Sequence, residues 1–124
     1  MKMTNHPVVH FEIGCSDGGK TREFFHKLFD WDISGAGEGM TIDTGGTGAL
    51  SGHIVELAPE LGNYITIYVE VEDLELYLKK ASELGGKTLV PPVTLPGQGS
   101  FAWLAAPEGN IIGIWKSETV SASN

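Results

Sequence analysis

Residues 98–116 read QGSFAWLAAPEGNIIGIWK, and this stretch decides the fold of the chain. Two apolar segments flank a short connection in which Pro107 sets φ to about −65° and Gly109 can adopt a positive φ. The pattern predicts a β-hairpin with a tight turn. In the second arm, Gly113 interrupts an apolar strand. Glycine at such a place is typical of a bulge, of a close approach by another part of the backbone or of the floor of a cavity.

Upstream of the hairpin, the same succession of elements is predicted twice. Each time a strand with alternating apolar and polar residues is followed by an acidic residue, Asp17 or Asp73, that can cap a helix. Ser16 is an alternative cap for the first helix. The helices are predicted over 20–31 and 73–84, the second ended by Gly85 and Gly86. The predicted strands are residues 7–14, 32–35, 40–44, 49–56, 64–71, 88–90, 101–106 and 111–115.

These elements form a tandem repeat of the order βαβββ. Asp17 and Asp73 are 56 residues apart, so His10 corresponds to Thr66 and Glu12 to Tyr68. We assign the first repeat to about residues 7–57, the second to about 63–117 and a tail to 118–124. Neither repeat can bury a sheet face by itself, so we expect residues 1–124 to form a single α+β domain.

The alternation also predicts which side chains are buried. One face of the two first strands should lie under the helices, with the residues Val9, Phe11, Ile65 and Ile67. The apolar stripes of the helices should lie on the sheet; they comprise Phe24, Phe25, Leu28 and Phe29 in the first helix and Leu74, Tyr77, Leu78, Ala81 and Leu84 in the second. His26 is off the first stripe, and we interpret it as a solvated histidine rather than a ligand.

Composition narrows the class of protein. The net charge of −8 and the scattered basic residues make nucleic acid an unlikely partner. No run of about 18 apolar residues is present, so no membrane partner is expected. The sequence shows no signal peptide, and the single cysteine, Cys15, cannot form an internal disulfide. The cytoplasm is the expected location.

Several of these features together resemble the vicinal oxygen chelate superfamily. The features are the paired repeats, His10 on the first strand, the helix end FHKLFDW at 25–31, the step LGGK at 84–87 and the hairpin PEGNI at 107–111. That superfamily includes glyoxalase I, extradiol dioxygenases and bleomycin and fosfomycin resistance proteins. The resemblance implies an open, barrel-like sheet of eight strands with helices outside and a cavity inside. It also implies a homodimer.

Metalloenzymes of that superfamily take their ligands from the first and fourth strands of each repeat. The resemblance places His10 at the first ligand position and His53 or Glu56 at the second. At the other two positions this chain has Thr66 and Gly113, which are poor or impossible ligands. We therefore expect no cofactor. If the protein is an enzyme, a divalent ion such as Zn, Ni, Fe or Mn would be required.

Two functions remain open at this point. The first is a metal-free binding protein for a small aromatic or cationic molecule, whose predicted ligand-binding residues are His10, Glu12, Thr66, Tyr68, Glu70 and Trp115. The second is a metal-dependent lyase, isomerase or dioxygenase of the same superfamily. For His10 and Trp115, a purely structural role in the cavity wall or the core is an equal alternative.

Overall fold

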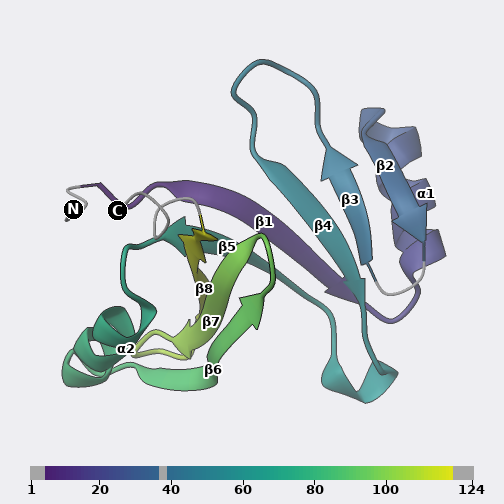
Figure 1. Ribbon diagram of the computed structural model, residues 1–124. Coiled ribbons are helices and arrows are strands. Elements are labelled where there is room, and N and C mark those ends of the chain that lie inside the picture. The colour runs from purple at the N-terminus through teal and green to yellow at the C-terminus, as the bar shows by residue number, and fades with distance from the viewer. Residues whose placement is uncertain (1–4, 37–38, 119–124) are drawn as a thin grey trace. The chain divides into compact units, whose positions relative to one another are not determined.

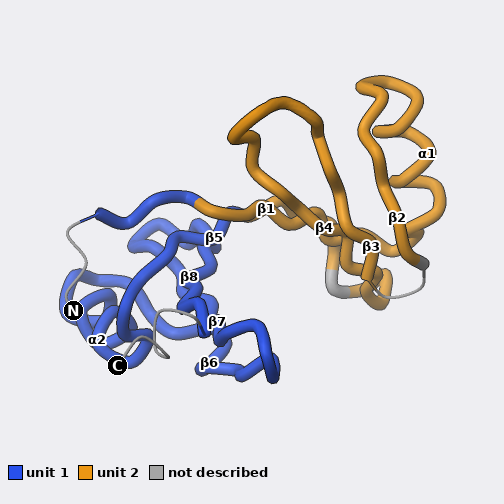
Figure 2. Tube along the Cα trace, turned by 45° about the horizontal axis from the view of Figure 1, so that its top comes forward, with its two compact units in different colours: residues 1–8, 67–124 blue, residues 9–66 orange. Residues whose placement is uncertain are grey.

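The structure, a computed structural model, describes residues 5–36 and 39–118, and the chain divides into two compact units. Unit 2 comprises residues 9–66, and unit 1 comprises residues 1–8 with 67–124 (Figure 2). Neither helix in the described ranges has the length and apolar character that a membrane crossing requires.

Unit 2 contains the first βαβββ repeat (Figure 1). Its elements are β1 (Val8–Cys15), α1 (Gly18–Phe29), β2 (Asp32–Ala36), β3 (Gly39–Asp43) and β4 (Ser51–Glu56), followed by the short 3-10 helix η1 (Pro59–Leu61). The strand order is β2-β3-β4-β1. Strands β1 and β4 are parallel, while β2, β3 and β4 pair antiparallel.

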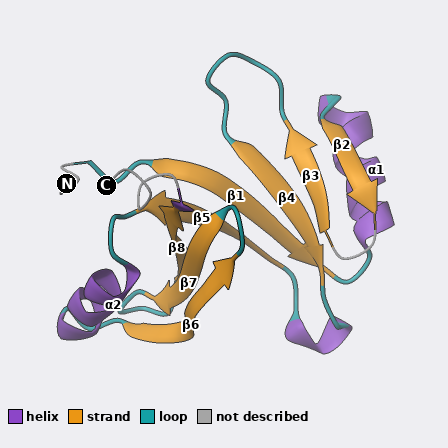
Figure 3. Ribbon diagram, viewed as in Figure 1, coloured by secondary structure: helices purple, strands orange, loops and turns teal. Residues whose placement is uncertain are grey.

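Unit 1 contains the second repeat (Figure 3). Its elements are β5 (Tyr64–Glu70), whose first residues are counted with unit 2, α2 (Leu74–Glu83), β6 (Lys87–Leu95), β7 (Gly99–Ala105) and β8 (Ile111–Ser117). The order is β5-β8-β7-β6, with β5 and β8 parallel. The predicted α+β class, with two tandem βαβββ repeats and eight strands, is therefore confirmed.

The helix caps form as the sequence predicts. Asp17 Oδ1 accepts the backbone N–H of Lys20 at 2.9 Å, and Asp73 Oδ1 accepts that of Leu76 at 3.1 Å. The first helix nevertheless spans Gly18–Phe29 rather than residues 20–31, because Asp30 adopts a left-handed conformation and its N–H bonds to His26 O at 2.8 Å.

The predicted apolar stripe of α1 is largely wrong. Only Phe25 packs against the core, whereas Phe24, Leu28 and Phe29 are 58%, 56% and 54% exposed. The buried residue of this helix is Gly18, whose side of the helix faces β4 through a hydrogen bond from its N–H to Glu56. In α2, Leu74 and Leu78 are buried as predicted, but Leu84 is 78% exposed.

Each unit has its own apolar core. The core of unit 2 comprises Ile13, Cys15, Ile33, Met40, Ile42 and Ile54, with Phe11, Phe25 and Trp31 packed against it. The core of unit 1 comprises Val71, Leu74, Leu78, Ala102 and Ile114, with Tyr77 and Leu104 packed against it.

The prediction that Ile65 and Ile67 lie under a helix is wrong. Their side chains are 70% and 37% exposed, although Phe11, predicted in the same layer, does pack against the core. The reason is that α2 contacts β6, β7 and β8, so that the first residues of β5 receive no comparable cover.

The hairpin of β7 and β8 forms as predicted, with Ala105 paired to Ile111 and Gly109 at a φ of 96°. The strand predicted at 88–90 is much longer, Lys87–Leu95, because it continues through Pro91 and Pro92 with register shifts on both sides of Val90. Proline is tolerated there because β6 is the last strand in the order of unit 1 and pairs through one edge with β7.

Candidate functional site

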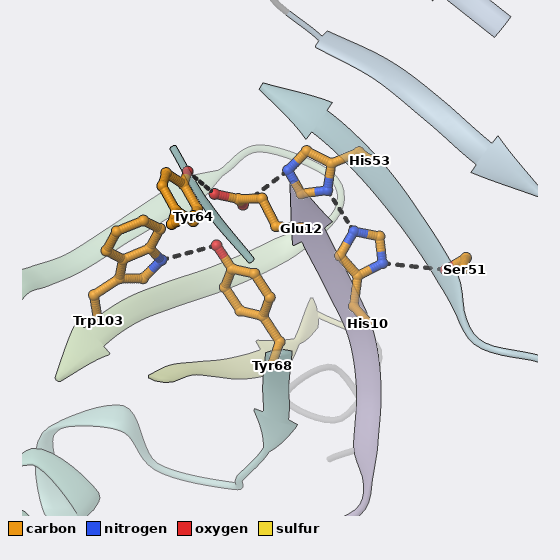
Figure 4. A network of polar contacts seen from close by, with 7 residues as sticks. All are labelled: His10, Glu12, Ser51, His53, Tyr64, Tyr68 and Trp103. Carbon is orange, nitrogen blue, oxygen red and sulfur yellow. Dashed lines mark hydrogen bonds and ion pairs between the residues drawn. The ribbon is translucent and has the colours of Figure 1, made fainter. Parts of the chain in front are cut away.

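A series of contacting polar side chains extends across β1 and β4 in unit 2 (Figure 4). The two strands are parallel, and their register pairs His10 with Ser51 and Glu12 with His53. Because alternate residues of a strand point to the same face, these four side chains project from one side of the sheet. Tyr64, the first residue of β5, joins them at Glu12.

The contacts run without interruption from a surface hydroxyl to a buried carboxylate. Ser51 Oγ lies 3.1 Å from His10 Nδ1, and His10 Nε2 lies 2.5 Å from His53 Nδ1. His53 Nε2 lies 2.9 Å from Glu12 Oε1, and the Tyr64 hydroxyl donates to Glu12 Oε2. We call the five residues Ser51, His10, His53, Glu12 and Tyr64 the relay.

One arrangement of protons satisfies every contact of the relay. An ionised Glu12 can only accept, so His53 donates from Nε2 and its Nδ1 must then accept. His10 donates to that nitrogen from Nε2 and accepts at Nδ1 from the Ser51 hydroxyl. In this assignment, which uses the neutral form of each imidazole, all donors point toward the carboxylate; the tautomers are assigned from the network.

Burial changes along the relay. Glu12 is only 4% exposed, His10 and His53 are half-buried and Ser51 is exposed. Burial, followed by the neighbouring His53, lowers the pKa of His10 below its ordinary value of 6.5, while the Glu12 carboxylate acts in the opposite direction. His10 is therefore unprotonated at neutral pH and can accept a proton.

The structure brings together three of the residues singled out in the sequence, His10, Glu12 and His53. It places Glu56 elsewhere, where its Oε2 accepts the N–H of Gly18 at 2.8 Å at the start of α1. Sequence reasoning missed Ser51 and Tyr64. The spacing of two between Ser51 and His53, with the same spacing between His10 and Glu12, was the only signal for the first of these.

The other predicted residues lie on β5 and β8. Thr66 and Tyr68 are buried, and Glu70 is the register partner of Trp115 in unit 1. Tyr68 accepts a hydrogen bond of 2.8 Å from Trp103 Nε1 (Figure 4), and its ring meets Phe101 edge to face with centroids 6.3 Å apart. Sequence reasoning missed Phe101 and Trp103 as well. We call Tyr68, Phe101, Trp103 and Trp115 the aromatic face.

The aromatic face lies on the side of the unit 1 sheet that α2 does not cover. Phe101 pairs with Trp115 and Trp103 with Gly113, so their side chains share one side of the sheet, whereas Ile114 turns to the core under the helix. The gap left by Gly113 is filled, since a Cβ there would lie 2.5 Å from Tyr68 Cδ2. In place of the predicted bulge, close backbone approach or cavity floor, the ring of Tyr68 packs against Gly113.

The residues at the metal-ligand positions of the superfamily do not fit a metal ion. Tyr68 occupies the space at Gly113, Thr66 offers only a hydroxyl, and both nitrogens of His53 are engaged by His10 and Glu12. Within residues 5–36 and 39–118, no group of three or more His, Cys, Asp or Glu side chains is arranged to hold an ion.

Known proteins share both the sequence pattern and the fold. The chain is 28% identical over 81 residues to CFP32 of Mycobacterium tuberculosis (strain CDC 1551 / Oshkosh), which is provisionally named a glyoxylase; the match covers 65% of this chain and 31% of CFP32. It is 24% identical to the anthracycline biosynthesis protein DnrV of Streptomyces peucetius, over 86% of this chain and 45% of DnrV. The chain thus spans less than half the length of these relatives.

A solved structure with a similar fold is methylmalonyl-CoA epimerase from Mycobacterium tuberculosis. Its TM-score is 0.62 at 12% identity, with 94% of this chain and 91% of that chain covered. The family model described as Glyoxalase/Bleomycin resistance protein/Dioxygenase superfamily matches residues 8–114. The chain therefore belongs to the glyoxalase, bleomycin resistance protein and dioxygenase superfamily.

Proposed function

We propose that the protein binds a small molecule and transfers a proton to or from it through the relay of unit 2, without a metal ion. The observation that supports this proposal is the unbroken series of contacts from Ser51 through His10 and His53 to Glu12. A base held by a second group, which is itself fixed by a buried carboxylate, is the usual arrangement for general acid–base catalysis.

The proposed step moves one proton inward along the relay. The substrate proton passes to His10 Nδ1. Either the substrate takes the place of the Ser51 hydroxyl at this nitrogen, or the Ser51 hydroxyl carries the proton between the two. His10 passes its Nε2 proton to His53, and His53 passes its own to Glu12 or shares it with that carboxylate. The reverse sequence returns a proton to another atom of the substrate, so the relay ends unchanged and the net reaction is an isomerisation or an elimination.

The reaction classes named for similar proteins agree with this proposal. One relative is provisionally named a glyoxylase and one solved structure of the same fold is an epimerase. A metal-dependent lyase, isomerase or dioxygenase has less support as the function of this chain than the metal-free relay has. The reason is that Thr66 and Gly113 occupy positions at which metalloenzymes of the superfamily have ligands. We propose no cofactor, and a cytoplasmic location stays a prediction.

Deuterium exchange tests the relay directly. Hydroxyacetone, a small carbon acid, would be incubated in D₂O with wild-type protein, with His10→Gln and with His26→Gln, whose histidine is exposed on α1. We expect wild type and His26→Gln to accelerate exchange equally and His10→Gln to lower the rate about 10²-fold. Exchange that is equally fast with His10→Gln, or that wild type does not accelerate, would contradict the proposal.

A second candidate function is binding of a planar aromatic molecule on the aromatic face of unit 1. Four aromatic side chains on one side of a sheet, one of them with a hydroxyl, are typical of such a site. DnrV, a relative, is named for anthracycline biosynthesis. Proflavine, a planar aromatic cation, should quench tryptophan fluorescence, and Trp103→Leu should weaken binding several-fold, whereas Trp31→Phe in the core of unit 2 should not.

We further propose that the protein is a homodimer that uses the exposed face of α1. Phe24, Leu28 and Phe29 are each more than half exposed, and Phe24 and Leu28, four residues apart, lie on one face of the helix. Contiguous apolar surface of this kind is typical of an interface between proteins.

A further inference from the structure

A cavity lies in unit 1, between α2 and the face of the sheet that the helix covers. Its volume is about 330 Å³, within the range of small-molecule sites, and none of its lining residues belongs to the relay or the aromatic face. Strands β5, β7 and β8 contribute Val69, Leu104 and Ile114, and Val71 follows directly after β5. From α2 come Tyr77, Lys80 and Ala81, and Leu84 is the C-cap residue of the same helix; their spacing places them on one helix face.

The surface that lines the cavity is almost entirely apolar, and the lining residues with polar groups are His6, Tyr77 and Lys80. Val71 and Ile114 are 2% and 5% exposed and form its floor, while Lys80 and His6 are exposed. Among the described residues that line the cavity, Lys80 alone has a permanent charge. Its Nζ lies 5.0 Å from the centroid of the Tyr77 ring, which also lines the cavity.

Two other lining residues, His6 and Tyr77, are joined by a hydrogen bond. His6 Nδ1 lies 3.3 Å from the carbonyl oxygen of Glu70 and so donates to it, and His6 Nε2 lies 3.1 Å from the Tyr77 hydroxyl. The same hydroxyl lies 3.3 Å from Glu72 Oε2. Glu72 does not line the cavity, although its Oε1 is buried with no hydrogen-bond partner among the described residues, so the charge within the lining itself is that of Lys80.

We propose that this cavity is a binding site for a small amphipathic carboxylate, with its apolar part between α2 and the sheet and its carboxylate beside Lys80. The apolar walls provide the affinity for the hydrocarbon part. The ammonium of Lys80 provides a charge-assisted hydrogen bond, with the Tyr77 hydroxyl and His6 as further polar groups of the lining. The proposal does not depend on the relay.

Octanoate is a suitable probe, because it combines a carboxylate with a flexible apolar chain. It would be titrated at pH 7 into the full chain and followed by calorimetry and by the NMR signals of the methyl groups. We expect saturable binding that shifts the methyl signals of Val69, Leu104 and Ile114 and leaves those of Ile42 and Ile54 in the other core unchanged.

Two neighbouring lysines supply the decisive comparison. Lys80→Gln should weaken octanoate binding at least tenfold, about 1.4 kcal/mol, whereas Lys79→Gln, which removes the same charge from a residue outside the cavity, should leave it unchanged. Octylamine, which carries the opposite charge, should bind much more weakly than octanoate.

Three results would overturn the proposal. The first is no methyl shift at saturating octanoate, and the second is an equal loss of binding in the two lysine variants. The third is stronger binding of octylamine that Glu72→Gln abolishes, which would assign the cavity to cations. If Leu84→Ser instead converts a dimer to a monomer, the opening is covered by a second copy of the chain and the carboxylate site is wrong.

Discussion

Tyr68 and Gly113 are register partners in the parallel pair of β5 and β8, and the ring of Tyr68 lies where a side chain at position 113 would begin. In unit 2 the corresponding register partners are Glu12 and His53. The same place in the two repeats therefore holds a histidine hydrogen-bonded to a carboxylate in one and a ring packed on a glycine in the other. We therefore expect substitutions at this place to affect packing in unit 1 and the hydrogen bonds of the relay in unit 2.

A methyl group at position 113 should destabilise the protein. Gly113→Ala would place its Cβ 2.5 Å from the ring of Tyr68, so we expect a loss of about 1–3 kcal/mol in the free energy of unfolding. Urea denaturation would measure it. Gly39→Ala is the control, because no atom of the described residues, its chain neighbours aside, lies within 4 Å of the added Cβ there. Equal stability of both variants would show that Tyr68 does not pack on Gly113.

The purified protein should hold no stoichiometric transition metal. Thr66 and the closed space at Gly113 leave too few ligands to retain zinc or nickel against water and buffer. Elemental analysis after dialysis against each ion would measure the content. About one metal per chain, lost in His10→Ala, would contradict this prediction and favour the metalloenzyme. For the same reason Gly113→Glu should not create a metal site unless Tyr68 is also reduced to a small residue.

Stability should fall with acid partly because of His10. Its pKa is lowered in the folded state, so between that value and the ordinary 6.5 the unfolded chain binds more protons. The stability that neutral His10 contributes is therefore complete above about pH 6.5 and is lost as the pH falls through that window. His10→Gln should show a shallower decline in melting temperature between pH 7 and pH 5 than wild type does. Parallel declines would mean that His10 is not buried in its neutral form.

Substitution of isoleucine should cost more free energy of unfolding at a buried strand position than at an exposed one. Ile54 is fully buried, so Ile54→Ala should cost about 2–5 kcal/mol, whereas Ile65→Ala should change the free energy of unfolding by less than about 0.5 kcal/mol. Ile67→Asp, which the sequence alone would make severely destabilising, should be mild because that side chain is 37% exposed. Calorimetric melting of the three variants would measure these differences.

The proposed dimer can be tested through α1. Analytical ultracentrifugation at micromolar concentration should give a dimer for wild type and a monomer for Phe24→Ser with Leu28→Ser. Lys27→Ser on the same helix is the control, since its side chain is exposed and forms only a surface ion pair with Glu23. A wild-type monomer would rule out the dimer, and an unchanged dimer in the double variant would move the interface away from α1.

The features that the sequence predicted correctly are those that depend on neighbouring residues. The caps at Asp17 and Asp73 and the turn at Gly109 follow from local backbone chemistry, and the tandem repeat follows from their spacing. The exposure of Ile65 and Ile67 could not be predicted in this way, since it depends on which strands α2 covers. The exposure of Phe24, Leu28 and Phe29 on α1, where only Phe25 of the predicted stripe packs against the core, likewise depends on contacts between elements.

The relay was predictable only in part. The residue types His10, Glu12 and His53 pointed to chemistry, but the glycines before β4 left its register open between His53 and Glu56. The parallel pairing of Glu12 with His53 decides that register. Tyr64 lies at the start of the second repeat, 52 residues from Glu12 in the sequence, and no local pattern relates the two.

The two prolines of β6 have a consequence for solubility. Proline has no backbone N–H, so Pro91 and Pro92 remove two donors from the last strand of unit 1. A strand from another molecule that approached this edge could not complete a regular ladder of hydrogen bonds. Pro91 and Pro92, which made β6 look shorter in the sequence, thus oppose the addition of a strand from another molecule at this edge of the folded protein.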